Sequence, residues 1–123
     1  MKRLILLAFV APALTALPED SVPRKVAVTM PAGEIHEECM NLKAGEKRSY
    51  EWKSDVPVDF NVHYHHEPKV FFPVKKDAVT ADRGTFVAKS AEGYCWMWTA
   101  GKKPARIEGS IVIPVETGNQ PKR

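Results

Sequence analysis

Apolar and polar residues alternate along much of the chain between residues 25 and 115, which is the pattern of strands that bury one face. The segment from Gly93 to Thr99 stands out, because it holds two of the three tryptophans and one of the two cysteines. Alternation divides a strand into two faces. One face here carries Cys95, Met97 and Thr99, and the other carries Tyr94, Trp96 and Trp98. Because both faces are apolar, the strand is either covered on both sides or exposes an aromatic patch that a ligand or partner covers.

The rest of the alternating pattern predicts short strands separated by turn residues. These strands cover residues 25–30, 35–42, 49–53, 56–66, 70–74, 85–89, 93–99 and 106–115, with a short extended piece at 78–80. Turn residues at 54–55, 75–77 and 82–84 divide the middle of the chain. No window of helical length keeps a helical apolar period. The pattern therefore predicts an all-β fold, an antiparallel β-sandwich of about eight strands.

The two ends of the chain differ from this middle part. Lys2 and Arg3 precede an apolar run that small residues follow, which is typical of a secretory signal peptide, here over residues 1–16. We expect cleavage after Ala13 or Ala16, a folded domain at 25–116 and a polar tail at 117–123. The apolar run is too short for a membrane anchor. We therefore expect an exported protein, periplasmic or secreted, with no transmembrane anchor in the mature chain.

The charge and the motifs exclude several classes of function. The chain has 18 basic and 15 acidic residues, and without Lys2 and Arg3 the count is 16 against 15, a charge near +1. This balance leaves no basic stripe for a phosphate backbone, so nucleic acid is not an expected partner. The sequence also lacks a nucleophile elbow, a phosphate-binding glycine loop and a dinucleotide fingerprint. We expect a protein that is not an enzyme and that binds another protein or a small ligand.

The two cysteines predict one disulfide, Cys39–Cys95. Exported domains of this size often need such a covalent link. The bridge spans 56 positions of the sequence, and loop entropy values it at about 4 kcal/mol. The alternative is a pair of reduced thiols that bind a metal, which an oxidising compartment disfavours.

Three segments together resemble a known family. They are Glu38-Cys39, the strand Val58 to Val62, and the late segment Gly93 to Trp96. An exported all-β chain with these segments resembles the GOLD domain, the lumenal β-sandwich of cargo receptors that cycle between endoplasmic reticulum and Golgi. In that family the two cysteines pair and join the two sheets, which the resemblance transfers to Cys39 and Cys95. For this chain the resemblance implies a soluble, bacterial, single-domain relative in which the fold serves binding.

A histidine cluster is the sharpest candidate for metal chemistry. His63 and His65 are two residues apart on an expected strand, so they lie on one face about 7 Å apart at Cα, near enough to bind one ion. His66 follows directly, and Met97 is an available thioether. Imidazole and thioether ligands suit copper or zinc. We place the Cys95 and Met97 face inward, so Met97 meets the histidines only if the strand twists; the alternative is a solvated histidine-rich strand end.

The leading hypothesis is a non-catalytic binding or accessory domain. Its binding face would carry Trp96, Trp98 and Tyr94 on the outer side of the strand, near the histidines. The alternative for these aromatic residues is a structural role in the core. The alternative function is periplasmic binding of copper or zinc by His63 and His65, with His66 or Met97.

Overall fold

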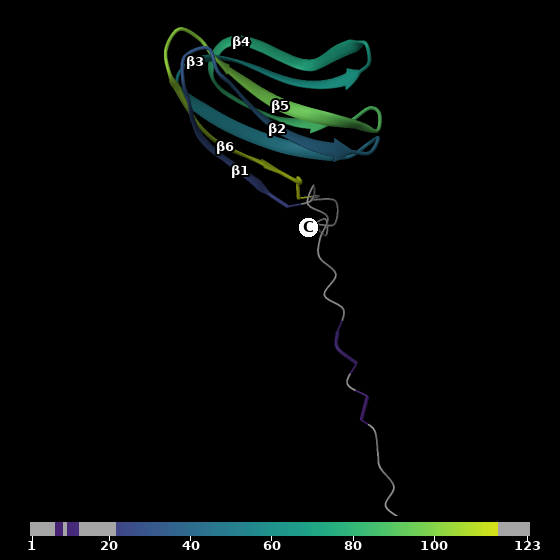
Figure 1. Ribbon diagram of the computed structural model, residues 1–123. Helices are drawn as coiled ribbons and strands as arrows, with labels where there is room; N and C mark the ends of the chain where they lie inside the picture. Colours follow the sequence, from purple (N-terminus) through teal and green to yellow (C-terminus); the bar gives the residue numbers. More distant parts are fainter. Residues whose placement is uncertain (1–6, 9, 13–21, 116–123) are drawn as a thin grey trace, which may run out of the picture.

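The chain folds into one curled antiparallel sheet of six strands (Figure 1). The computed structural model describes residues 7–8, 10–12 and 22–115, so both predicted cleavage points and the tail at 117–123 lie outside the described residues, as does most of the predicted signal peptide. The strands are β1 (Arg24–Met30), β2 (Ile35–Leu42), β3 (Lys47–His66), β4 (Lys69–Val87), β5 (Glu92–Ala100) and β6 (Ala105–Val112). Within the described part of the chain, no helix is long and apolar enough to cross a membrane.

The long strand β3 causes the sheet to curl. The sheet order is β1-β6-β3-β5-β2, and β4 pairs with β3 as well. The first half of β3 pairs with β6, where Trp52 lies opposite Gly109, and its second half pairs with β5, where Phe60 lies opposite Trp98. One half of the sheet contains β1 and β6, and the other half contains β5 and β2. Because β3 belongs to both halves, their inner faces enclose a common core. The structure has six strands rather than the predicted eight or so. The predicted strands at 49–53 and 56–66 form the single strand β3, and those at 70–74 and 85–89 belong to the single strand β4.

The predicted breaks turn out to be bends inside β3 and β4. The register between these strands shifts after Lys53 and again near Val58, so residues 54–55 lie in a bend of β3 rather than in a turn. Asp55 Oδ1 accepts a hydrogen bond from the backbone N–H of Arg106 (2.8 Å), and Asp59 Oδ1 accepts one from that of Ala78 (2.9 Å). Ala78 has a positive φ of 52°. Both carboxylates therefore bind backbone groups near the bends.

The two margins of the curled sheet differ. At one margin, Arg24 on β1 donates a hydrogen bond to the backbone oxygen of Cys39 on β2 (2.6 Å). The guanidinium also lies 3.6 Å from the carboxylate of Glu38. These contacts hold the edges of β1 and β2 near each other. At the other margin lies β4, which among the described strands pairs only with β3, so its outer edge is open for contact along both halves of the sheet.

The core is aromatic. Trp52 and Phe60 on β3 and Trp96 and Trp98 on β5 are all buried, and the ring centroids of Trp52 and Trp98 lie 6.2 Å apart in an edge-to-face arrangement. Phe60 packs between those two indoles, with centroid distances of 5.1 and 5.5 Å. Aromatic pairs of this geometry add about 0.5–1.5 kcal/mol each beyond their buried area. The aromatic face of β3 therefore packs against the aromatic face of β5 in the core.

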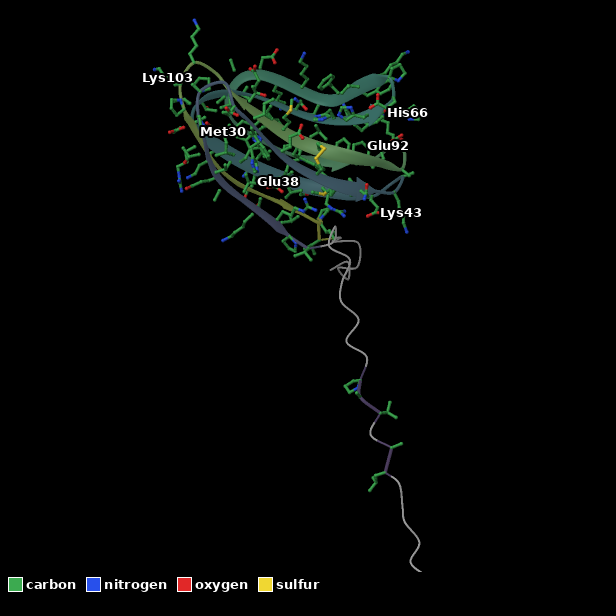
Figure 2. All side chains as sticks on the ribbon, in the orientation of Figure 1. Met30, Glu38, Lys43, His66, Glu92 and Lys103 are labelled. Carbon is green, nitrogen blue, oxygen red and sulfur yellow. A yellow bond between two sulfur atoms is a disulfide. The ribbon has the colours of Figure 1, made fainter. Side chains whose placement is uncertain are left out.

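The disulfide between Cys39 and Cys95 is confirmed. It joins β2 to β5, where the two residues lie directly opposite each other with their Cα atoms 4.0 Å apart (Figure 2). The bridge therefore links adjacent strands within one half of the sheet, and the expectation that it joins two separate sheets is wrong. Cys39 is exposed and Cys95 half-buried, so the bridge lies on the outer face.

Candidate functional site

The predicted aromatic binding face is wrong, because Tyr94, Trp96 and Trp98 point into the core. All three side chains are fully buried. Tyr94 and Trp96 pack edge to face against Phe86 on β4, with centroid distances of 4.9 and 5.6 Å. The face of β5 that carries Cys95 is the outer one, opposite to our expectation. The three aromatic side chains are therefore structural, and any binding surface must be sought elsewhere.

A groove opens between the two halves of β4. Its volume is about 490 Å³, within the range of natural ligand sites. Six aromatic side chains from both halves of the sheet line it: Tyr50, Tyr64, Phe71, Phe72, Phe86 and Tyr94. The groove exists because β4 bends with β3, so that the two ends of one strand face each other across the open margin of the sheet.

Apolar side chains stand at the rim of this groove. Phe71 is 40 % exposed and stacks on the ring of Tyr64, with centroids 5.1 Å apart and an interplanar angle of 14°. Phe72 and Val87, which also line the groove, are 47 % and 45 % exposed. A cluster of half-exposed apolar residues around an aromatic floor is typical of a surface that a partner covers. The sequence predicted a strand at 70–74 and a separate one at 85–89, but it gave no sign that the two would face each other across a groove.

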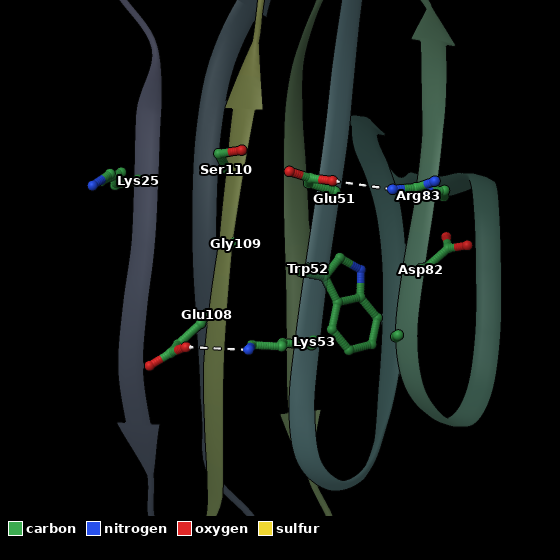
Figure 3. Close-up of a pocket in the computed structure, with 10 residues that line it drawn as sticks. Lys25, Glu51, Trp52, Lys53, Asp82, Arg83, Glu108, Gly109 and Ser110 are labelled. Carbon is green, nitrogen blue, oxygen red and sulfur yellow. Dashed lines mark hydrogen bonds and ion pairs between the residues drawn. The ribbon is translucent and has the colours of Figure 1, made fainter.

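A larger concave surface lies on the outer face of β1, β6, β3 and β4 (Figure 3). It measures about 750 Å³, and its side chains are mainly charged. Arg83 lies 3.4 Å from the carboxylate of Glu51, and Lys53 lies 3.9 Å from that of Glu108. These pairs are exposed, so each contributes little. Charges of both signs alternate on this surface, and Trp52 is the one large apolar side chain that lines it, so it is the weaker candidate despite its size.

The outer face of β2, β5 and β3 carries a second cluster of interest. Pairing across the three strands places Glu37 beside Met97 and Met97 beside Asn61, and in the next row it places Cys39 beside Cys95 and Cys95 beside His63. Met97 thus shares a face with the histidines, contrary to our expectation. Glu37 joins them from a strand that the sequence could not align with β3.

His63 is buried although it lies on the outer face. The side chain is 5 % exposed, and Phe72 on β4 covers it with ring centroids 5.8 Å apart. Nδ1 lies 2.8 Å from the side-chain oxygen of Asn61, and Nε2 lies 3.6 Å from a carboxylate oxygen of Glu37. Burial lowers the pKa of His63, while the charge of Glu37 opposes this to a smaller extent. The neutral imidazole is therefore favoured at neutral pH.

The other two histidines of the cluster separate. His65 has its ring centroid 5.3 Å from that of His63, with the rings almost perpendicular. His66 instead lies 3.4 Å from the carboxylate of Glu92, at the end of β3 and the start of β5 (Figure 2). Of the four predicted metal ligands, the fold brings His63, His65 and Met97 to one face, and it leaves His66 at the strand end.

Glu37 also lies close to the two sulfur atoms, since its carboxylate and the sulfurs of Cys39 and Cys95 are within 4.8 Å of one another. Those sulfurs are bonded to each other. Thiolates are the sulfur ligands that metals prefer, so the oxidised protein offers imidazole, carboxylate and thioether groups on this face.

Comparison with known proteins gives a fold but no family. The sequence matches no protein family and no curated protein. The fold matches PliG of Aeromonas hydrophila, a periplasmic lysozyme inhibitor of g-type lysozyme, with a TM-score of 0.50 and 11 % identity over 79 % of this chain and 92 % of that one. It also matches the Yersinia pseudotuberculosis-derived mitogen, with a TM-score of 0.52 and 7 % identity over 81 % of this chain and 92 % of that one. At such low identity, the likeness establishes the shared β fold alone.

Proposed function

We propose that this chain is an exported, non-catalytic binding domain that captures a protein partner through the groove between the two halves of β4. The observation that carries the proposal is the aromatic floor with a half-exposed apolar rim. Large aromatic side chains dominate binding energy at protein interfaces. The rim side chains are exposed by two-fifths or more, which favours a protein surface over an enclosed small molecule.

Three further observations support export and binding. The disulfide is typical of proteins outside the cytoplasm, and the N-terminal pattern of residues 1–16 predicts a signal peptide. Both structural neighbours are named for an effect on other proteins or on cells, one as a lysozyme inhibitor and the other as a mitogen. The resemblance to the GOLD domain stays a prediction and agrees with a role in binding.

The test compares one groove variant with one matched control. Phe71→Asp places a charge on the groove rim without disturbing the core. Ile35→Asp changes an apolar side chain that is 56 % exposed, on the far edge strand β2. Each purified protein is assayed as an inhibitor of g-type lysozyme and as bait for proteins of a periplasmic extract, with recovered proteins identified by mass spectrometry.

We expect a partner that binds the wild type and the Ile35→Asp control but not Phe71→Asp. Loss of one aromatic anchor at an interface weakens binding by about 2 kcal/mol or more, which is a factor of about 30 in Kd. A partner that Phe71→Asp and the control bind equally well would refute the groove as the binding surface. A wild type that neither inhibits lysozyme nor retains any protein would contradict the proposed function.

A further inference from the structure

The groove between the two halves of β4 is cationic as well as aromatic. Among the described residues that line it, Lys89 is the one charged residue. Lys75 stands at the rim, with its Nζ 5.6 Å from the ring centroid of Phe72. Phe72 belongs to the first half of β4, and Lys89 follows the end of the second half. Each wall of the groove therefore carries a cation.

One carboxylate contacts the floor of the groove, and its charge is already balanced. Asp82 accepts a hydrogen bond from the hydroxyl of Tyr50 (3.1 Å), and its other oxygen lies 2.6 Å from Nζ of Lys76. The side chain of Asp82 is 8 % exposed and that of Lys76 is 45 % exposed, so the lysine is the member of this pair that reaches the solvent. Glu67 and Asp77, on either side of the first half of β4, do not line the groove. The charge that the groove presents to a partner is therefore positive.

The segment that carries Lys89 is held in place by hydrogen bonds on both sides. Ala88 exchanges two backbone hydrogen bonds with the turn at residues 43–46 (2.7 and 2.9 Å). On the other side, the hydroxyl of Tyr94 donates to the backbone oxygen of Ser90 (2.8 Å). The backbone at Lys89 therefore needs little further ordering when a partner binds, and a site that is ordered in advance loses less affinity to entropy.

We propose that the partner enters this groove with an acidic segment, in which an apolar side chain lies between aspartate or glutamate residues. The inference rests on the proposed function and adds the chemistry of the partner. The apolar side chain packs on the aromatic floor beside Phe71 and Phe72, and the flanking carboxylates meet Lys75 and Lys89. Cations on the walls of an apolar cleft concentrate the electric field on an approaching anion, which raises the rate of association.

The same lysines disfavour a second copy of this chain as the occupant. The first half of β4 carries Lys69, Lys75 and Lys76, and edge-to-edge pairing of two copies along this half would bring their like charges together. Lysine and proline on an open edge oppose such pairing, and Pro73 has no N–H to donate to a neighbouring strand. An acidic partner that binds through side chains in the groove meets neither obstacle.

The experiment selects ligands for the purified, oxidised protein from a phage-displayed library of random dodecapeptides. The wild type and Phe71→Ala are each used as bait, and the peptides that only the wild type enriches are sequenced. Phe71→Ala removes an exposed ring of the groove without adding a charge. One selected peptide is then synthesised with a fluorescein label, and its Kd for each variant is measured by fluorescence anisotropy.

Charge reversals test the two cations separately. Lys89→Glu changes the cation that lines the groove, and Lys75→Glu changes the one at the rim. Lys103→Glu is the matched control, because it makes the same charge change in the loop beyond the end of β5, whereas Lys89 precedes the start of that strand; Figure 2 shows Lys103 and Glu92 at opposite ends of the sheet. All three lysines are exposed, so the variants leave the core intact.

We expect the peptides that only the wild type enriches to be negatively charged and to contain an aromatic or aliphatic residue. Lys89→Glu should weaken peptide binding by about threefold to thirtyfold, because an attraction becomes a repulsion. Lys75→Glu should weaken it less, and Lys103→Glu should stay within about twofold of the wild type. Raising the NaCl concentration from about 0.05 M to about 0.5 M should weaken binding to the wild type more than binding to Lys89→Glu, which has lost the attraction that salt screens.

The outcomes separate this inference from the proposed function. Neutral or basic peptides that still require Phe71 would leave the groove as the binding surface and refute the acidic partner. Equal losses in Lys89→Glu and Lys103→Glu would also refute it, because the attraction would then come from the whole protein. A wild-type dimer in sedimentation velocity that Phe71→Ala dissociates would make a second copy the occupant. If no peptide distinguishes the wild type from Phe71→Ala, the acidic segment is wrong as a ligand, and the capture assay alone decides the proposed function.

Discussion

Gly109 on β6 is the position at which the smallest substitution should do the most damage. It lies opposite Trp52 on β3 (Figure 3). A Cβ added there would lie 2.4 Å from the backbone oxygen of Glu51 and 2.6 Å from Cβ of Trp52. Such atoms essentially never approach within 3.0 Å, so in Gly109→Ala β6 must retreat by at least 0.6 Å, the difference between 3.0 and 2.4. The neighbouring atoms are the backbone oxygen of Glu51 and the Cα and Cβ atoms of Trp52, which rotation of a side chain cannot move away.

The size of the effect follows from two opposing contributions. Overpacking of this kind costs about 1–3 kcal/mol. Alanine also restricts the unfolded chain more than glycine does, which stabilises the folded protein by about 0.4–1 kcal/mol. Gly101→Ala isolates that second contribution, since nothing lies within 4 Å of a Cβ at Gly101. We expect Gly109→Ala to be about 2 kcal/mol less stable than Gly101→Ala, a difference of roughly 10 °C in melting temperature for a domain of this size.

Urea unfolding followed by tryptophan fluorescence measures both variants against the wild type. The slope of the free energy of unfolding against urea concentration must stay the same in all three, so that the midpoints report stability. The reasoning is refuted if Gly109→Ala lies within about 0.5 kcal/mol of Gly101→Ala, because β6 would then accommodate the methyl group without loss.

Three further predictions concern the core and the bridge. Because Trp52, Trp96 and Trp98 are all buried, acrylamide should quench the fluorescence of the native protein far less than that of the unfolded protein; equal quenching would place a tryptophan at the surface. Replacing Cys39 and Cys95 together by alanine should lower the free energy of unfolding by about 4 kcal/mol for a 56-residue separation; a loss under about 1 kcal/mol in urea unfolding would contradict this. Burial, and secondarily the charge of Asp82, raises the pKa of Tyr50 above its usual value. Since the folded state keeps the phenol proton that the unfolded state releases above about pH 10, stability should fall as pH rises past 10, and Tyr50→Phe should remove part of this slope; identical slopes would argue against it.

The inward face of β5 was assigned wrongly from the sequence for a physical reason. Both faces of Gly93 to Thr99 are apolar, and alternation alone does not say which of two apolar faces is buried. The sequence of β2 holds the missing information. Cys39 alternates with Glu37 and Asn41, whereas Met40 and Leu42 form the apolar face and are buried. A disulfide between adjacent strands requires both cysteines on one face, so Cys95 follows Cys39 outward and the tryptophans turn inward.

The number of strands and the position of Glu37 depended on information that a single sequence lacks. Asp55 and Asp59 serve equally well in a turn or at a bend of a long strand, where their carboxylates bind backbone N–H groups. Only the pairing of β3 with two different partners decides between them. In the same way, Glu37 lies near His63 because of the registers of β2 on β5 and of β5 on β3. Neither register follows from the order of residues along one strand.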